Sequence, residues 1–324
     1  MKSRLFDFFP VPRILAMQTT GVAVSDDVLH FVKLGEDGLS SYGETKLPEN
    51  VIEYGSVANP GEFVKILTDL RRKYNLDLVE VSIPEEKSYL FKTTVLGENT
   101  KDIRSNLELH LQENVPFKIN EVVFDFSIIS SEGNSHEVIV SVLPVAVVNQ
   151  YLGVFKEASL SPLSFQVESQ AVTQAVVKRN SKENVLVINL HDGNKAGFYI
   201  VDGKNVVFSS TVDVDGEDSV HIFDGVNDQK TSKKDDFGVL IRETKKIMTY
   251  WKTHDGKSIS KIIVTGNISD ENKIIDQLSG NLSIRAEIAN VWQNAFSFDE
   301  IIPKMKRKDS LRFAASIGLA LPNQ

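Results

Sequence analysis

The sequence predicts an α/β protein built from two related halves, and three observations support that fold class. Two segments share one pattern, in which a short apolar strand, a polar turn and further strands follow one another. A helical segment and another apolar strand then follow each of these meanders, which is the alternation typical of α/β proteins. The chain is 324 residues long and 41% hydrophobic, enough for two cores. The repeated pattern indicates an internal duplication.

The first copy of the pattern opens the chain's first half. Residues 21–24 and 28–34 predict two strands, and the polar turn 25–27 between them is typical of a hairpin. Residues 60–74 carry apolar side chains at helical spacing, and the apolar run 78–83 predicts a buried strand after that helix.

The second copy begins at residue 184. Strands are expected at 184–190, 197–201 and 205–209, with an Asp-Gly pair between the last two as a strong hairpin signal. Residues 235–253 have apolar positions at helical spacing, and 261–265 predict the buried strand that follows. The order of elements therefore matches that of the first copy.

A segment with a different pattern lies between the halves and predicts a small inserted unit. Residues 102–113 predict a helix, and residues 121–129 and 137–143 predict two strands that pair as a hairpin. The polar loop 130–135 is expected to close this hairpin. Residues 144–158 then form one apolar stripe, which predicts a helix.

Composition excludes several classes of function. Lys and Arg number 36 against 44 Asp and Glu, so the formal net charge is −8. Such a chain has no basic field to concentrate a polyanion, and no nucleic-acid partner is expected. The chain has no cysteine, which excludes thiol catalysis and disulfides and is typical of a reducing compartment.

Local motifs exclude further classes. The six histidines stand singly, without the spacing of a metal-binding motif, so no metal site is expected. The motifs of serine hydrolases, dinucleotide-binding proteins and P-loop proteins are absent. No stretch approaches the roughly 20 apolar residues that cross a bilayer, and Pro10 and Pro12 interrupt the first apolar run. Neither a membrane span nor a signal peptide is expected.

Several segments resemble, in the same order, those of the type IV pilus assembly protein PilM family and its distant relative FtsA. They are residues 9–17, 115–125, 151–170, 241–250, 262–266 and 316–320. The resemblance runs over nearly the whole chain. It implies an actin-like ATPase fold of duplicated RNase H-like domains, with an inserted small α/β module and a reduced subdomain in the second half.

The resemblance also implies a division of the chain into parts. These are the first actin-like domain (1–84), the inserted module (85–143), a helical return to the first domain (144–180), the second actin-like domain (181–310) and a closing helix (311–324). The helix at the end of the chain is expected at 310–320. The polar stretch 213–237 stands where the family places a whole subdomain.

Members of this fold bind ATP through two β-turns whose backbone N–H groups surround the phosphates, while a carboxylate orients Mg²⁺. Carried over to this chain, the resemblance implies a set of nucleotide-binding positions. These are Ser25, Lys33, Asn189, Lys195, Gly266 and Asn267.

Other positions depart from the family pattern. Ala23 stands where the first carboxylate is expected, and the two aspartates after Ser25 would repel a phosphate. Asn189 replaces the second carboxylate, His191 replaces a glycine, and only the first glycine of the adenosine loop, Gly266, is kept. Because phosphoryl transfer depends on electrostatic positioning of phosphate and metal, we expect a pseudo-ATPase without catalytic residues and without ATP or Mg²⁺ as cofactors.

The resemblance implies a cytoplasmic scaffold of a type IV pilus or type II secretion-like inner-membrane platform. Its partner would be the cytoplasmic N-terminal peptide of a PilN-like membrane protein, held near the inserted module, with membrane contact only through partners. The chain itself and a pilus ATPase are further implied partners. One alternative is an ATP-binding switch, and another is an FtsA-like filament protein, which would need an amphipathic helix after residues 321–324.

Overall fold

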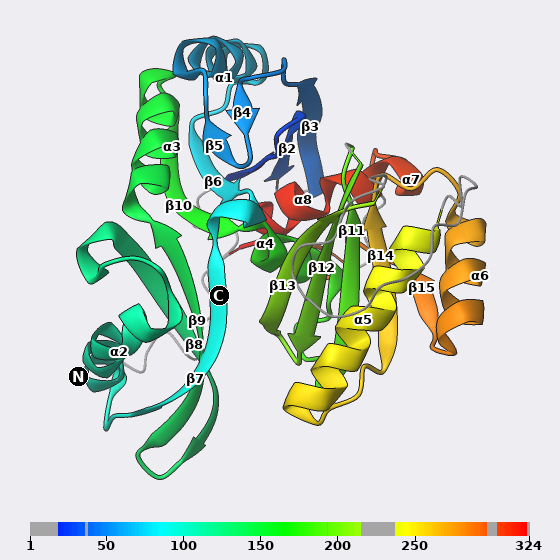
Figure 1. Cartoon of the computed structure of the whole chain (residues 1–324). Coiled ribbons are helices and arrows are strands. Elements are labelled where there is room, and N and C mark those ends of the chain that lie inside the picture. The colour runs from blue at the N-terminus through cyan, green and yellow to red at the C-terminus, as the bar shows by residue number, and fades with distance from the viewer. Residues whose placement is uncertain (1–18, 36–37, 193, 215–236, 297–302, 323–324) are drawn as a thin grey trace, which may run out of the picture. The chain divides into compact units, whose positions relative to one another are not determined.

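The computed structural model describes residues 19–35, 38–192, 194–214, 237–296 and 303–322 (Figure 1). Residues 9–17 and most of the polar stretch 213–237 lie outside these ranges. The chain folds into two compact units. The first unit comprises Met1–Lys87, Val145–Ala175 and Val291–Gln324, and the second comprises Ser88–Pro144 and Val176–Asn290.

A five-stranded sheet with the order β10-β6-β1-β2-β3 is the centre of the first unit. Its strands are β1 (Thr20–Val24), β2 (Val28–Gly35), β3 (Gly38–Lys46), β6 (Leu78–Ile83) and β10 (Ser161–Val167). β1, β2 and β3 form an antiparallel meander, whereas β1, β6 and β10 run parallel. A two-stranded hairpin, β4 (Ile52–Glu53) with β5 (Ser56–Val57), lies outside this sheet.

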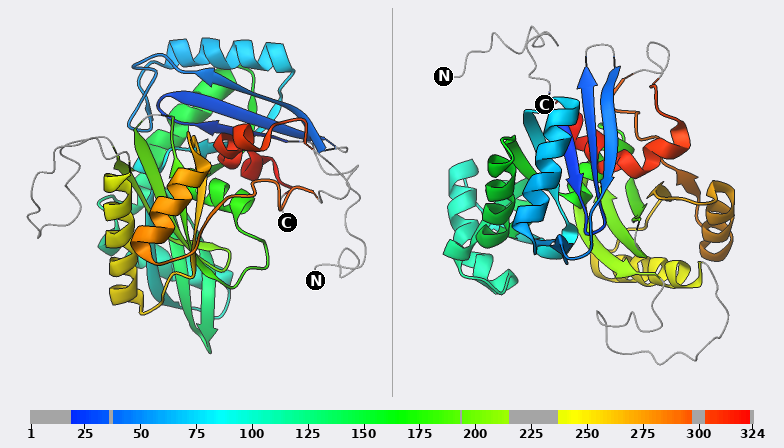
Figure 2. Two further views of the ribbon diagram at one scale, coloured as in Figure 1. Left: turned by 90° about the vertical axis from the view of Figure 1, so that its right-hand side faces the viewer. Right: turned by 90° about the horizontal axis from the view of Figure 1, so that it is seen from above.

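Helix α1 (Pro60–Tyr74) has the bounds that the sequence predicts, because its ends are encoded locally. The Asn59 side chain accepts a hydrogen bond from the first turn, Pro60 suits the first helical position, and Asn75 ends the helix in the left-handed conformation. Phe63 makes edge-to-face contacts with two aromatic rings of α3 (Val145–Glu157). Figure 2 shows α1 on one face of the first sheet and the last helix, α8, on the other.

The expected single helix at 310–320 is instead broken into three pieces. They are α7 (Arg307–Ser310), the 3-10 turn η4 (Leu311–Phe313) and α8 (Ala314–Ala320). All seven residues of α8 are buried. Gly318 allows α8 to cross α4 (Glu168–Val176), since a Cβ at this position would lie 1.8 Å from the carbonyl oxygen of Ala171. Helical periodicity alone did not reveal the break.

The second unit repeats the topology of the first, with the sheet order β13-β12-β11-β14-β15. Its strands are β11 (Asn184–Leu190), β12 (Lys195–Asp202), β13 (Asn205–Asp213), β14 (Lys261–Gly266) and β15 (Ala286–Ile288). Again three strands form an antiparallel meander and three run parallel. Helices α5 (Gly238–Asp255) and α6 (Glu271–Leu282) connect the parallel strands. The predicted duplication is confirmed.

A three-stranded antiparallel sheet with the order β7-β9-β8 forms the inserted module, together with α2. Its elements are β7 (Tyr89–Leu96), α2 (Thr100–Asn114), η3 (Ile119–Glu121), β8 (Val122–Glu132) and β9 (Ser135–Pro144). The short turn η2 (Glu85–Lys87), which precedes the module, belongs to the first unit. The predicted hairpin is confirmed, but its loop is shorter than expected, since the ladder continues to Glu132 and Ser135 and leaves only Gly133 and Asn134 as the turn. Strand β7 was not predicted.

Charged side chains link the module to the rest of the second unit. Lys92 on β7 contacts the carboxylate of Asp255 at the end of α5 and lies 3.3 Å from the carboxylate of Glu137 on β9. Asp255 is only 9% exposed in its side chain. The ring of Trp251, one helical turn earlier, lies 6.0 Å from the Lys92 ammonium.

Candidate functional site

The first unit offers a candidate site where its parallel strands end. In open α/β sheets, ligands bind at the edge formed by the carboxyl ends of the strands. Here β1, β6 and β10 run parallel, so the turn after Val24, the segment after Ile83 and the start of α4 after Val167 share one edge. Each of these three positions carries a polar or acidic group.

The turn after β1 is closed by its own side chain. The Ser25 hydroxyl donates to the carbonyl oxygen of Val28 at 2.9 Å and accepts from the Val28 N–H at 3.2 Å. A carboxylate oxygen of Asp26 accepts a hydrogen bond of 3.0 Å from the backbone N–H of Gly55 in the β4–β5 turn. The side chains of Ser25 and Asp26 therefore close this turn and tie it to the β4–β5 turn.

Tyr151 on α3 binds the carbonyl group of Gly55, whose N–H group is bound by Asp26. Its buried hydroxyl donates to the Gly55 carbonyl oxygen at 3.2 Å. Burial, assisted by the nearby charges of Asp26 and Glu86, raises the pKa of the Tyr151 hydroxyl far above its ordinary value. This hydroxyl therefore stays protonated and remains a hydrogen-bond donor.

The amino end of α4 is occupied by a carboxylate of the same chain. Glu85, which is 6% exposed, accepts hydrogen bonds from the backbone N–H of Ser169 at 2.9 Å and from the Ser169 hydroxyl at 3.0 Å. A helix amino end attracts anions through its N–H groups and its dipole. Glu85 supplies that negative charge here.

A similar edge in the second unit brings two turns together. The backbone N–H of Asn267 donates to the carbonyl oxygen of Leu190 at 2.8 Å. Its side-chain amide donates to a carboxylate oxygen of Asp192 at 2.7 Å. The N–H of His191 donates to the carbonyl oxygen of Lys195 at 3.0 Å and closes the turn between β11 and β12.

Gly266 has a structural reason to be glycine. Its φ is +94°, in the region that favours glycine, and a Cβ there would lie 2.1 Å from the Leu190 carbonyl oxygen. The glycine thus permits the close approach of β14 to β11.

The structure gathers four of the predicted nucleotide-binding residues at the edge of the second unit. Asn189, which is buried, pairs with Thr265 next to Gly266, while Asn267 and Lys195 bond to the same turn. These four residues are therefore neighbours in space.

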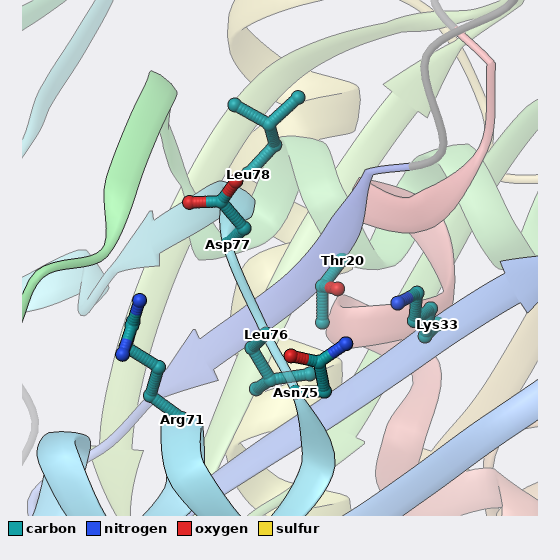
Figure 3. A pocket seen from close by; sticks show the side chains of 7 residues that line it. All are labelled: Thr20, Lys33, Arg71, Asn75, Leu76, Asp77 and Leu78. Carbon is teal, nitrogen blue, oxygen red and sulfur yellow. The ribbon is translucent and has the colours of Figure 1, made fainter.

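Ser25 and Lys33 of the first unit are not brought together. Lys33 pairs with Thr20 at the far end of the β1–β2 ladder from Val24, which places it about 13 Å along the strands from the turn at about 3.3 Å per residue. Lys33 instead lines a pocket with Thr20 and Arg71 (Figure 3).

Glu85 and Asp192 were not predicted as site residues. For Glu85 a signal was available, because it lies two residues after a buried parallel strand, at the edge where such sheets place functional groups. Asp192 lies in the turn 191–195, of which only His191 and Lys195 were considered. Both residues were missed because their partners, Ser169 and Asn267, are remote in sequence.

Two further observations concern metal ligands and membrane-spanning helices among the described residues. Within the described ranges, no group of three His, Asp or Glu side chains is placed to hold a metal ion. None of the helices in these ranges is long and apolar enough to cross a membrane.

Comparison with known proteins identifies the family. The family model of the type IV pilus assembly protein PilM matches residues 21–218. A solved PilM-PilN type IV pilus biogenesis complex is similar with a TM-score of 0.74 and 17% identity, covering 94% of this chain and 98% of that chain. The ethanolamine utilization protein EutJ from Carboxydothermus hydrogenoformans is similar with a TM-score of 0.52 and 10% identity, covering 97% and 92%.

No curated protein sequence matches the chain. The family match covers more than half of its residues, and the duplicated sheets with their inserted module agree with the structural likeness. The chain therefore belongs to the type IV pilus assembly protein PilM family and has an actin-like ATPase fold.

Proposed function

We propose that this protein is a cytoplasmic scaffold of a type IV pilus or type II secretion-like assembly platform. It binds the cytoplasmic N-terminal peptide of a PilN-like inner-membrane protein and reaches the membrane only through such partners. The support is its family membership together with the likeness to a PilM-PilN complex over 98% of the solved chain. A second copy of the chain and a pilus ATPase are further proposed partners.

The inserted module is the proposed peptide-binding region. Its strand β8 is an edge strand, so one row of backbone N–H and C=O groups has no neighbouring strand within the module. Val123 and Ile128 on this strand are 46% and 44% exposed. An extended peptide that adds to such an edge gains main-chain hydrogen bonds and apolar contacts with the outward side chains.

The scaffold works as a pseudo-ATPase. The observation that carries this part of the proposal is the engagement of three carboxylates at the carboxyl edges of the sheets: Asp26 with Gly55, Glu85 with Ser169, and Asp192 with Asn267. A phosphate brought to these edges would meet negative charge, and the donors it needs are already bonded. Peptide binding does not depend on any of these groups.

The test is calorimetric titration of the full chain with Mg²⁺-ATP and, separately, with the cytoplasmic N-terminal peptide of a PilN-like protein. We expect saturable heat with the peptide, none with ATP, and none with a scrambled peptide. Val123→Glu should weaken peptide binding, whereas Leu109→Glu, at a 76% exposed leucine on α2, should not. Micromolar ATP binding would replace the pseudo-ATPase with the nucleotide-dependent switch, in which the neighbouring residues Asn189, Lys195, Gly266 and Asn267 of the second unit would be contacts.

A further inference from the structure

A polar pocket lies in the first unit, at the opposite end of β1 from the turn at Ser25. It has a volume of about 350 Å³ and is lined by polar groups from three elements: Thr20 of β1, Lys33 of β2, and Arg71, Asn75 and Asp77 at and after the end of α1 (Figure 3). Two leucines, at positions 76 and 78, complete the lining. The volume is in the range of small-molecule sites in proteins, roughly 300–1,000 Å³.

The two cations of this pocket have no partner in the described part of the chain. No carboxylate in the described ranges forms an ion pair with Lys33 or Arg71, and Arg71 Nε is buried without a hydrogen-bond acceptor. A buried donor without an acceptor destabilises the protein, so an acceptor that enters the pocket would remove that cost. Figure 3 shows Arg71 and Lys33 on opposite sides of Thr20 and Asn75.

The chemistry of the lining favours an oxyanion with more than two oxygens. Arg71 offers a planar fork of N–H groups, Lys33 an ammonium, Thr20 a hydroxyl and Asn75 an amide, all of which are donors. A phosphate group has three strongly accepting oxygens and up to two negative charges, so it uses more of these donors than a carboxylate does. Asp77 opposes an anion, but the two cations outnumber it.

We propose that this pocket binds the phosphate group of a small phosphomonoester, with Arg71 and Lys33 as the two charged contacts. The site lies at the opposite end of β1 from the carboxyl edge of the sheet and shares no residue with the proposed peptide region. Lys33, which the family resemblance implies as a nucleotide-binding residue, would contact the phosphate group in this pocket instead. Substitutions of Asp77 and of Lys33 are expected to have opposite effects on affinity, because their charges are opposite.

The experiment is calorimetric titration of the full chain with inorganic phosphate and with glycerol 3-phosphate, each against sodium chloride of equal ionic strength. We expect saturable binding, weakened about tenfold or more in Arg71→Gln and in Lys33→Gln and tightened in Asp77→Asn. Arg72→Gln, at the exposed neighbouring arginine of the same helix turn, is the matched control and should bind as the wild type does.

Each outcome decides the proposal. Equal affinity for the two probes would mean that the phosphate group alone is recognised, and tighter binding of the ester would mean that the substituent also contacts the pocket; both support the site. Absence of saturable binding overturns it, as does equal weakening in Arg72→Gln or an Asp77→Asn chain that binds more weakly. If Arg71→Gln fails to fold, Lys33→Gln and Asp77→Asn still decide, because both change partly or fully exposed side chains.

Discussion

Glu85 and Ser169 are joined by two hydrogen bonds, although 84 residues separate them in the sequence. The carboxylate accepts from both the backbone N–H and the hydroxyl of Ser169, and both residues are buried. This pair connects the end of β6 to the first turn of α4. It fills the anion-binding end of that helix with the chain's own charge.

Replacing Glu85 by Ala should lower the free energy of unfolding by about 2 kcal/mol, because a buried N–H and a buried hydroxyl lose their charged acceptor. Ser169→Ala removes the hydroxyl bond alone and should cost about 1 kcal/mol. Urea denaturation of the two single variants and the double variant measures the coupling. Additive effects in that cycle would contradict the direct interaction.

Gly266→Ala should destabilise the second unit by more than about 2 kcal/mol, since the new methyl group would overlap the backbone of Leu190 at a positive φ. Gly280→Ala is the control, because this glycine lies inside α6 and the methyl group that alanine adds there would have no atom within 4 Å. There the change should stabilise by about 0.5–1 kcal/mol through helix propensity. Thermal unfolding compares the two, and a neutral Gly266→Ala would refute the close approach.

Leu107 and Leu109 give a matched pair on helix α2. Leu107 is 2% exposed within the core of the inserted module, whereas Leu109 is 76% exposed. Leu107→Ala should cost about 2–5 kcal/mol and weaken peptide binding, because the module loses its packing. Leu109→Ala should stay within about 0.5 kcal/mol of the wild type. Chemical denaturation measures the stability of both variants, and peptide titration measures their binding. If Leu107→Ala unfolds the module and peptide binding is unchanged, the module is not the binding region.

The contact of Lys92 with Asp255 predicts a pH dependence. Burial lowers the pKa of Lys92, but hydrogen bonds and charge from Asp255 and Glu137 outweigh it, and the net pKa is raised. A raised lysine pKa stabilises the fold below the ordinary value of about 10.4, and this contribution is lost as the pH rises through the folded-state pKa.

Lys92→Met should therefore be less stable than the wild type from pH 7 to 9, and the difference should shrink above pH 10. The measurement is the free energy of unfolding as a function of pH. Lys204→Met, at an exposed lysine in the turn between β12 and β13, is the control and should lie within about 0.5 kcal/mol of the wild type at pH 7. If the stability difference between Lys92→Met and the wild type grew above pH 10, the predicted stabilisation by charged Lys92 would be contradicted.

Local signals explain how much of the fold could be predicted from the sequence. The bounds of α1, β6 and β11 agree with the predicted ones, because capping residues and apolar runs mark them within a few positions. Strand β7 was missed because its half-exposed residues give no clear alternation. The break at Leu311–Phe313 was missed because the 3-10 turn and the buried α8 that follows it carry apolar residues in succession, which look like one helical stripe.

The sequence by itself determined the α/β class, the duplication, the position of the inserted module and membership of the family, since all of these depend on periodicity and motif order along the chain. Only the tertiary structure decided that Glu85 bonds Ser169, that Asn267 bonds Asp192, and that Lys33 and Arg71 line one pocket far from Ser25. The physical reason is strand register, because a ladder fixes which end of a strand a side chain occupies, and register depends on pairing with residues far away in the sequence.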